Sequence, residues 1–203
     1  MKNLIVITSL LAAGTLPANA ATTQKYTSVG NFYDGIWGVD KDIILKDSDL
    51  NQSSGFYTFE TSDLDFSNLK SATFNIYLKN FFDICNLKIW AVQRENTDLS
   101  EKIAKEIIES ANQKSDFVSI SLTKNQEKSM LSIDIRTILQ KITKDKDVAI
   151  LIGLGGGSCL LDDDKGNPTS LSVEFFAVPE PSMFGLFAGT LALALAGTRR
   201  RRK

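Results

Sequence analysis

Two neighbouring segments of the chain, 72–79 and 85–92, alternate apolar and polar residues, and this alternation limits the fold most strongly. A period of two is that of a β-strand with one buried face, and the short link at 80–83 would join the two strands as an antiparallel hairpin. The residues expected on the buried face are Phe74, Ile76, Leu78, Leu87, Ile89 and Ala91.

Other short segments are rich in apolar, aromatic or β-branched residues, and turn residues separate them. They are 43–45, 56–61, 117–122, 130–135, 148–154 and 171–175. About eight short strands with turns between them predict a mainly β protein, and specifically an antiparallel β-sandwich of jelly-roll type.

One amphipathic helix is expected as an insertion among the strands. In 98–112, apolar residues recur every four positions, which is the helical period. Asp98 and Glu101 have the spacing of a capping box at the start of this helix. A helical turn should also follow the strand at 130–135.

The N-terminus has the three parts of a secretory signal peptide. Lys2 precedes a mostly apolar stretch, 4–11, and Ala18-Asn19-Ala20 has the small-x-small pattern of a cleavage site. Residues 1–20 are therefore predicted to form a signal helix that is removed on export. The alternative is an uncleaved membrane anchor.

The C-terminus, 178–203, has three parts in a fixed order. An extended motif, Val178-Pro179-Glu180-Pro181-Ser182, precedes an uncharged apolar run at 183–197. As a helix, that run alone would be about 22 Å long, which is shorter than the ~30 Å hydrocarbon core of a bilayer. With its flanking residues added, the helix approaches the lower length limit for a transmembrane span. The alternative is a buried core helix. The chain ends in cations that would stop transfer on the cytoplasmic side: Arg199, Arg200, Arg201, Arg202 and Lys203.

This motif, short apolar helix and arginine cluster resemble the PEP-CTERM sorting signal of Gram-negative bacteria. The resemblance implies recognition of Pro179-Glu180-Pro181 by an integral-membrane exosortase, cleavage near the motif and transfer to the cell surface. It also implies an association with exopolysaccharide and biofilm. The protein would be held in the inner membrane by its short transmembrane helix before processing, and would then reach the cell surface or the extracellular matrix.

The middle of the chain has a second resemblance. The order of 56–61, 69–78, 132–139, 148–154 and 171–175 is similar to that of DNRLRE-type domains, which are jelly rolls of bacterial surface proteins that resemble carbohydrate-binding modules. The stretch that gives this family its name does not occur here. No sugar-binding residue is therefore carried over.

The charge and composition of the middle segment exclude several functions. Removing both ends leaves 21–177, or 157 residues (177 − 20), with 17 basic and 23 acidic residues and a net charge of −6 (17 − 23). An acidic domain argues against nucleic acid as a partner. The chain has no histidine, which excludes Ser-His-Asp and Cys-His catalysis and any His-ligated metal.

The two cysteines, Cys85 and Cys159, would meet an oxidising compartment after export. They predict either one disulfide or two buried thiols. A disulfide would close a loop of 75 residues (159 − 85 + 1), worth about 4 kcal/mol in the chain-entropy model.

A calcium ion is one candidate ligand of this chain. Asp162, Asp164 and Asn167 offer the hard oxygen ligands that Ca²⁺ prefers, without the spacing of an EF-hand. The alternative is a solvated acidic turn, with no cofactor at all.

Trp37 is the candidate sugar-stacking platform, because it lies among turn glycines. The alternative is a tryptophan that plugs one end of the core. Trp90, in the middle of a predicted strand, is expected in the core.

Together these features predict an exported, non-catalytic surface protein that adheres to or organises extracellular polysaccharide. A secreted carbohydrate-active enzyme with a carboxylate pair is the alternative, since glycoside hydrolysis needs no histidine. A structural matrix protein without a ligand is the third reading.

Overall fold

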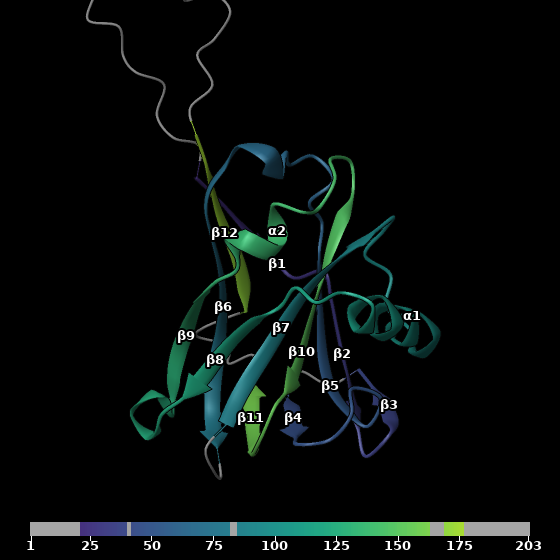
Figure 1. The fold of residues 1–203 in the computed structure, drawn as a ribbon, viewed down its shortest axis with the longest axis vertical. Helices are drawn as coiled ribbons and strands as arrows, with labels where there is room; N and C mark the ends of the chain where they lie inside the picture. The colour runs from purple at the N-terminus through teal and green to yellow at the C-terminus, as the bar shows by residue number, and fades with distance from the viewer. Residues whose placement is uncertain (1–20, 40–41, 82–84, 163–168, 177–203) are drawn as a thin grey trace, which may run out of the picture. The chain divides into compact units, whose positions relative to one another are not determined.

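The described residues are 21–39, 42–81, 85–162 and 169–176, and in the computed structural model they contain twelve β-strands (Figure 1). The strands form two sheets of six, and every strand pairing is antiparallel. The mainly β, antiparallel prediction is therefore confirmed. The described elements belong to one unit, Ala21–Phe176.

The first sheet is built around β10, which pairs with β5 on one side and with β7 on the other. The predicted strands at 56–61, 85–92, 117–122 and 148–154 all belong to this sheet. Its strands, in order across the sheet, are β3 (Ile36–Gly38), β2 (Ser28–Tyr33), β5 (Ser53–Phe59), β10 (Asp147–Leu154), β7 (Cys85–Arg94) and β8 (Val118–Leu122).

The second sheet is built around the long strand β6. On one side of β6 lies β9, and on the other side β11 and β12 follow each other end to end, because Asp162 pairs with Tyr77 and Ser170 pairs with Asn75. β4 pairs with β11, and β1 pairs with β12. The strands are β1 (Ala21–Lys25), β4 (Ile43–Lys46), β6 (Leu69–Phe81), β9 (Ser129–Asp134), β11 (Ser158–Asp162) and β12 (Ser170–Phe175).

One hydrophobic core takes its side chains from both sheets. The alternation read from the sequence predicts the buried faces correctly, because each of the six residues expected on the buried face is buried in this core. Those residues are Phe74, Ile76, Leu78, Leu87, Ile89 and Ala91. The predicted antiparallel hairpin of 72–79 with 85–92 is wrong, because β6 and β7 belong to different sheets and their side chains meet across the core. α2 (Arg136–Leu139) follows β9 as expected and adds Ile138 and Leu139 to the same core.

The amphipathic helix α1 (Glu101–Asn112) covers the other face of the first sheet, as Figure 1 shows. This contact makes a second core, in which β5 and β10 bury their outer faces as well. Double burial explains the nearly continuous apolar sequence of β10. The members of the second core are Phe32, Phe56, Trp90, Val92, Ala104, Ile107, Ile108, Ala111, Ala149 and Leu151.

The start of α1 differs from the capping box expected at Asp98. The N-cap is Ser100, whose hydroxyl oxygen accepts a hydrogen bond from the backbone N–H of Ile103 at 3.4 Å. Serine in extended backbone, three residues before its donor, gives the usual N-cap geometry, and Glu101 then lies in the first turn.

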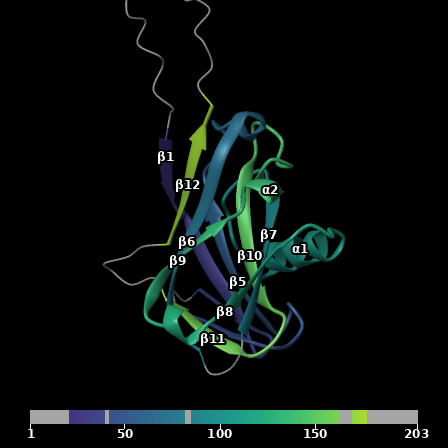
Figure 2. The ribbon, with the colours of Figure 1, turned by 60° about the vertical axis from the view of Figure 1, so that its left-hand side comes forward.

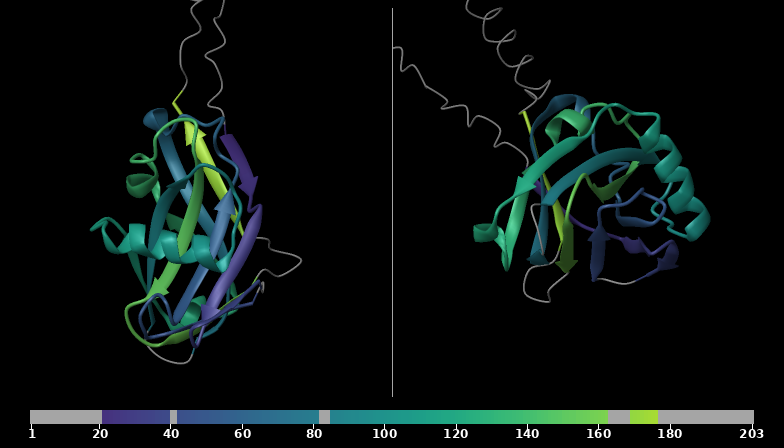
Figure 3. Two further views of the ribbon diagram at one scale, coloured as in Figure 1. Left: turned by 90° about the vertical axis from the view of Figure 1, so that its right-hand side faces the viewer. Right: turned by 60° about the horizontal axis from the view of Figure 1, so that its bottom comes forward.

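The first and last strands of the unit lie side by side, as Figure 2 shows most clearly. Ala21 is opposite Glu174, and Lys25 is opposite Ser170. The chain therefore enters and leaves the unit at the same end. The strands β3, β4 and β11 lie toward the other end (Figure 1). The two views of Figure 3 show the same arrangement from the side and from below.

Candidate functional site

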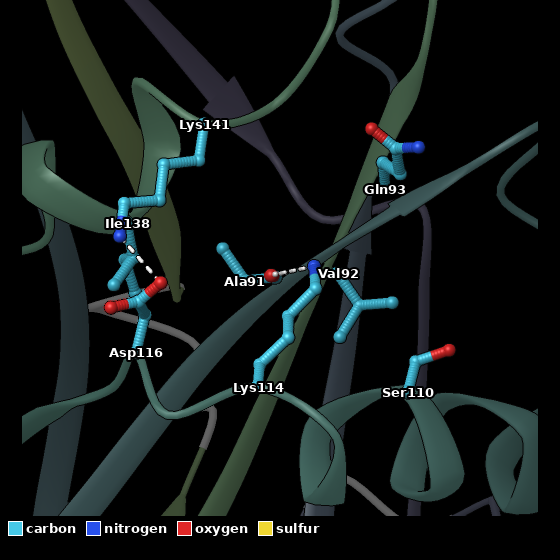
Figure 4. A pocket seen from close by; sticks show the side chains of 8 residues that line it. All are labelled: Ala91, Val92, Gln93, Ser110, Lys114, Asp116, Ile138 and Lys141. Atoms are coloured by element: carbon cyan, nitrogen blue, oxygen red, sulfur yellow. Dashed lines mark hydrogen bonds and ion pairs between the residues drawn. The ribbon is translucent and has the colours of Figure 1, made fainter.

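An open cleft of about 460 Å³ lies beside α1, where β8 no longer covers β7 (Figure 4). The pairing of β8 with β7 ends at Ile89 and Val118, so the last residues of β7 have β10 as their strand partner on one side only. Four separate parts of the chain line the cleft. They contribute Ala91, Val92 and Gln93 from β7, Ser110 from α1, Lys114 and Asp116 from the loop after α1, and Ile138 and Lys141 from α2 and the turn that follows it.

Lys114 lies at the centre of the cleft. The loop after α1 crosses β7, and there Lys114 Nζ donates a hydrogen bond to the carbonyl oxygen of Ala91 at 3.3 Å (Figure 4). The residue as a whole is exposed, but its ammonium group is partly removed from water. This burial lowers the pKa of Lys114, and the nearby Lys141 lowers it further, while Asp116 acts in the opposite direction.

Asp116 forms an ion pair with Lys141 and so joins the loop after α1 to the turn after α2. The two side chains are about half exposed, at 47% and 57%. An exposed pair of this kind adds little to stability. Its effect on the cleft is to neutralise one lysine, which leaves the charge of Lys114.

The rest of the lining is part polar and part apolar. Gln93 Oε1 accepts a hydrogen bond from the Thr143 hydroxyl at 3.2 Å, which orients the amide at the rim. Ser110 is half-buried, and Val92 and Ile138 are buried. The cleft thus offers one ammonium group, an amide, a hydroxyl and aliphatic carbon. Among the residues that line it, Asp116 is the one carboxylate.

The sequence did not single out Lys114, Asp116 or Lys141. They come from two loops that are distant in the sequence, and neither loop has a motif. The only local signal was that Lys114 and Asp116 follow the predicted helix directly.

Trp37 does not lie in a loop of turn residues. It is the middle residue of β3, it is half-buried, and its ring packs edge-on against Phe32 and Phe56 at centroid distances of 5.2 and 5.7 Å. The structure thus differs from the exposed platform that the sequence suggested, because the ring covers part of the second core. A sugar-stacking role for Trp37 stays a prediction. Trp90 is 8% exposed and lies in the second core, as expected.

Cys85 in β7 and Cys159 in β11 are both fully buried and are free thiols in this structure. Their side chains form a hydrogen bond across the two sheets. That hydrogen bond and burial raise the pKa of Cys159 far above the ordinary thiol range. The structure therefore brings together the two cysteines for which the sequence predicted either a disulfide or two buried thiols. In the structure they are two buried thiols.

Several predicted features lie outside the described residues. They are the signal peptide with Ala18 and Ala20, the sorting signal at 178–203, and the calcium candidates Asp164 and Asn167. Asp162 is the last residue of β11. Within 21–39, 42–81, 85–162 and 169–176, no group of three or more acidic or cysteine side chains is placed to hold a metal ion. Within the same ranges, no helix is long and apolar enough to cross a membrane.

No protein-family model matches the chain, and no curated protein matches it either.

Proposed function

We propose that this protein is an exported β-sandwich of jelly-roll type that is displayed at the cell surface after processing of a PEP-CTERM signal. It acts without catalysis, in adhesion to extracellular polysaccharide or in the organisation of the polysaccharide matrix. An exosortase-type membrane protease is its processing partner, and the inner membrane holds it until processing.

The observation that carries this proposal is the position of the folded unit in the chain. The unit Ala21–Phe176 begins directly after the Ala18-Asn19-Ala20 cleavage pattern and ends two residues before Val178, where the sorting motif begins. Removal of both signals would therefore leave the two sheets and both cores whole. This supports a protein whose two ends direct transport and whose folded unit carries out the extracellular function.

The pairing of β1 with β12 adds to this support. Because Ala21 lies opposite Glu174, both predicted processing sites join the unit at one end. The strands β3, β4 and β11 lie toward the other end of the unit. That arrangement suits a domain that contacts a polymer outside the cell.

The alternative, a glycoside hydrolase, requires two carboxyl groups on either side of the scissile bond. The cleft offers Asp116 alone, and Lys141 is its ion-pair partner. The cleft therefore favours binding over hydrolysis.

The test compares the native protein with a variant in which Pro179, Glu180 and Pro181 are all alanine. Intact mass and cell fractionation should show loss of the tail and surface location for the native protein, and a full-length, membrane-retained variant. A matched triple-alanine control at Glu101, Lys102 and Lys105, on the exposed face of α1, should behave as the native protein. Identical full-length masses and identical membrane location for native protein and variant would overturn the sorting part of the proposal.

A second measurement tests the matrix part. Matrix polysaccharide from the producing cells is immobilised, and retention of the native protein is compared with retention of an unrelated exported protein. Equal retention of the two would overturn the adhesion role while leaving the sorting result intact.

A further inference from the structure

We propose that the cleft beside α1 is a binding site for an acidic saccharide, in which Lys114 receives the carboxylate of a uronic acid residue. This inference rests on the proposed function and deepens it, because it names the class of polysaccharide that the domain recognises.

The first argument is the geometry of Lys114. An ammonium group has three N–H donors. The hydrogen bond to the Ala91 carbonyl holds Nζ against β7 and uses one donor. The cleft opens beside the same nitrogen, so the other donors are within reach of a ligand there (Figure 4). A carboxylate is the acceptor that gains most from such a donor, because a charge-assisted hydrogen bond is about twice as strong as a neutral one.

The second argument is the local charge. The unit as a whole is acidic, yet the cleft contains two lysines and one carboxylate. Asp116 is already engaged with Lys141, and this leaves one net positive charge at Lys114. Burial is the largest influence on that charge and disfavours it, Asp116 favours the charge more than Lys141 disfavours it, and the net result is a lowered pKa of Lys114. A bound anion would offset the cost of burial, so the ammonium group is more stable with an anion in the cleft than without one.

The third argument is the remainder of the lining. The Gln93 amide and the Ser110 hydroxyl can exchange hydrogen bonds with sugar hydroxyls. Val92 and Ile138, which are 3% and 5% exposed, add a small apolar part to the wall. The volume of about 460 Å³ is in the range of small-molecule sites. Because the cleft is open rather than enclosed, a residue within a longer chain can enter it.

An acidic peptide is the other ligand that carries carboxylates. A peptide that binds to a strand edge does so through main-chain hydrogen bonds. On the exposed side of β7, however, the Ala91 carbonyl already accepts the hydrogen bond from Lys114. A peptide strand would have to displace that lysine, whereas a saccharide needs only the side chains. The structure therefore favours the saccharide.

The experiment is a calorimetric titration of the full-length protein in detergent with tetragalacturonic acid. Its methyl ester, which has the same rings without the charges, is the matched ligand control. The native protein should bind the acid at least tenfold more tightly than the ester, and raising NaCl from 50 to 500 mM should weaken binding severalfold. Equal affinities for acid and ester would overturn the proposal.

The variants Lys114→Met and Lys102→Met separate the site from the overall charge, because Lys102 is exposed on α1 outside the cleft. Lys114→Met should weaken binding at least tenfold and Lys102→Met less than twofold, with thermal melts checking that both variants fold. Lys114→Arg keeps the charge and should retain most of the affinity. Equal losses for the two methionine variants would overturn the assignment of the site.

Tetraglutamate is the peptide arm of the same experiment. Binding of tetraglutamate as tight as that of tetragalacturonate, with the same dependence on Lys114, would replace the saccharide with an acidic peptide. Absence of binding to every probe would overturn this inference alone, because sorting and retention by native matrix are measured separately.

Discussion

The side chain of Cys85 in β7 is hydrogen-bonded to that of Cys159 in β11, so the two thiols meet between the sheets inside the main core. Seventy-three residues separate them in the sequence (159 − 85 − 1). Both side chains have an exposed fraction of 0%. The pair is thus shielded from solvent reagents once the protein has folded.

From the proposed export into an oxidising compartment, we expect Cys85 and Cys159 to be joined in a disulfide in the mature protein. The two thiols would pass two electrons and two protons to an oxidised thiol–disulfide oxidoreductase during folding. Intact protein from the cell surface should be about 2 Da lighter than the same protein after reduction under denaturing conditions. The closed loop of 75 residues should add about 4 kcal/mol to the free energy of unfolding, measured in urea with and without reductant.

The variant Cys85→Ser with Cys159→Ser is the control for that measurement, since reductant should leave its urea midpoint unchanged. A native protein that takes up two alkyl groups in denaturant without prior reduction would contradict the disulfide. In that case the buried pair seen in the structure would be the mature form.

Gly30→Ala should destabilise the unit through Trp37. A Cβ atom at Gly30 would lie 2.4 Å from Cη2 and 2.6 Å from Cζ2 of Trp37, and 3.2 Å from the Gly38 carbonyl oxygen. The indole would have to leave its position against Phe32 and Phe56, at a cost of about 1–3 kcal/mol for overpacking. Urea denaturation should show this loss, together with a red shift of the tryptophan emission.

Gly155→Ala is the matched substitution for Gly30→Ala. Its Cβ atom would meet Lys88 at Cε (2.6 Å) and Nζ (3.0 Å), which is the mobile end of a long side chain. The urea midpoint of this variant should stay close to that of the native protein. If both substitutions lowered the midpoint equally, the contact with Trp37 would not be the cause.

Asp147→Ala should remove a buried acceptor that holds the segment after β5 to the start of β10. Asp147 Oδ1 accepts hydrogen bonds from the backbone N–H groups of Thr61 at 2.9 Å and Ser62 at 3.1 Å. The residue is only 7% exposed, so alanine would leave two backbone N–H donors without this acceptor. Each lost hydrogen bond should lower the free energy of unfolding by up to about 3 kcal/mol. Chemical denaturation is the measurement, and Asp63→Ala, at an exposed position, should change the free energy of unfolding by less than about 0.5 kcal/mol.

Asp65 should make a small contribution to the acid stability of the unit. Hydrogen bonds from the hydroxyl and the backbone N–H of Ser67 lower the pKa of Asp65, and Lys144 lowers it further. A lowered pKa in the folded state stabilises the protein fully above the pKa of the unfolded chain, about 3.9, and this contribution is lost as the pH falls through the folded value.

The matching measurement is the melting temperature of the native protein and of Asp65→Asn between pH 2 and pH 6. The difference between the two should be largest near pH 6 and should shrink toward pH 2. A difference that is constant over this range would show that Asp65 acts through the shape of its turn and not through its charge.

The central strands were predictable because each buries residues in a regular pattern. β6, β7 and β10 contain enough alternating or continuous apolar residues to identify them from the sequence. β1 (Ala21–Lys25) was missed because its sequence, Ala-Thr-Thr-Gln-Lys, buries nothing and is held by main-chain pairing with β12. β2, β3 and β11 are short or rich in small residues. β3 pairs with its sequence neighbour β2, whereas β11 pairs with β4 and β6, which lie far away in the sequence.

The cleft was beyond prediction for a related reason. Its chemistry depends on the end of the β8 pairing at Ile89, which exposes Ala91 to the loop after α1. No local pattern around Lys114 or Lys141 records which residues of β7 lie beyond the pairing with β8. For Cys85 and Cys159 the sequence left two alternatives, one disulfide or two buried thiols, and it had no pattern that distinguishes them.

The position of β12 between β1 and β6 also determines how the unit would bear mechanical load. A cell pulling on the chain beyond Phe175, against a polymer held in the cleft, would draw β12 along its own axis. Hydrogen bonds in antiparallel sheets run perpendicular to the strands, so this pull shears the bonds on both sides of β12 simultaneously and does not peel them apart one by one. The strand that leads to the tail is therefore the one best placed to transmit tension without unravelling.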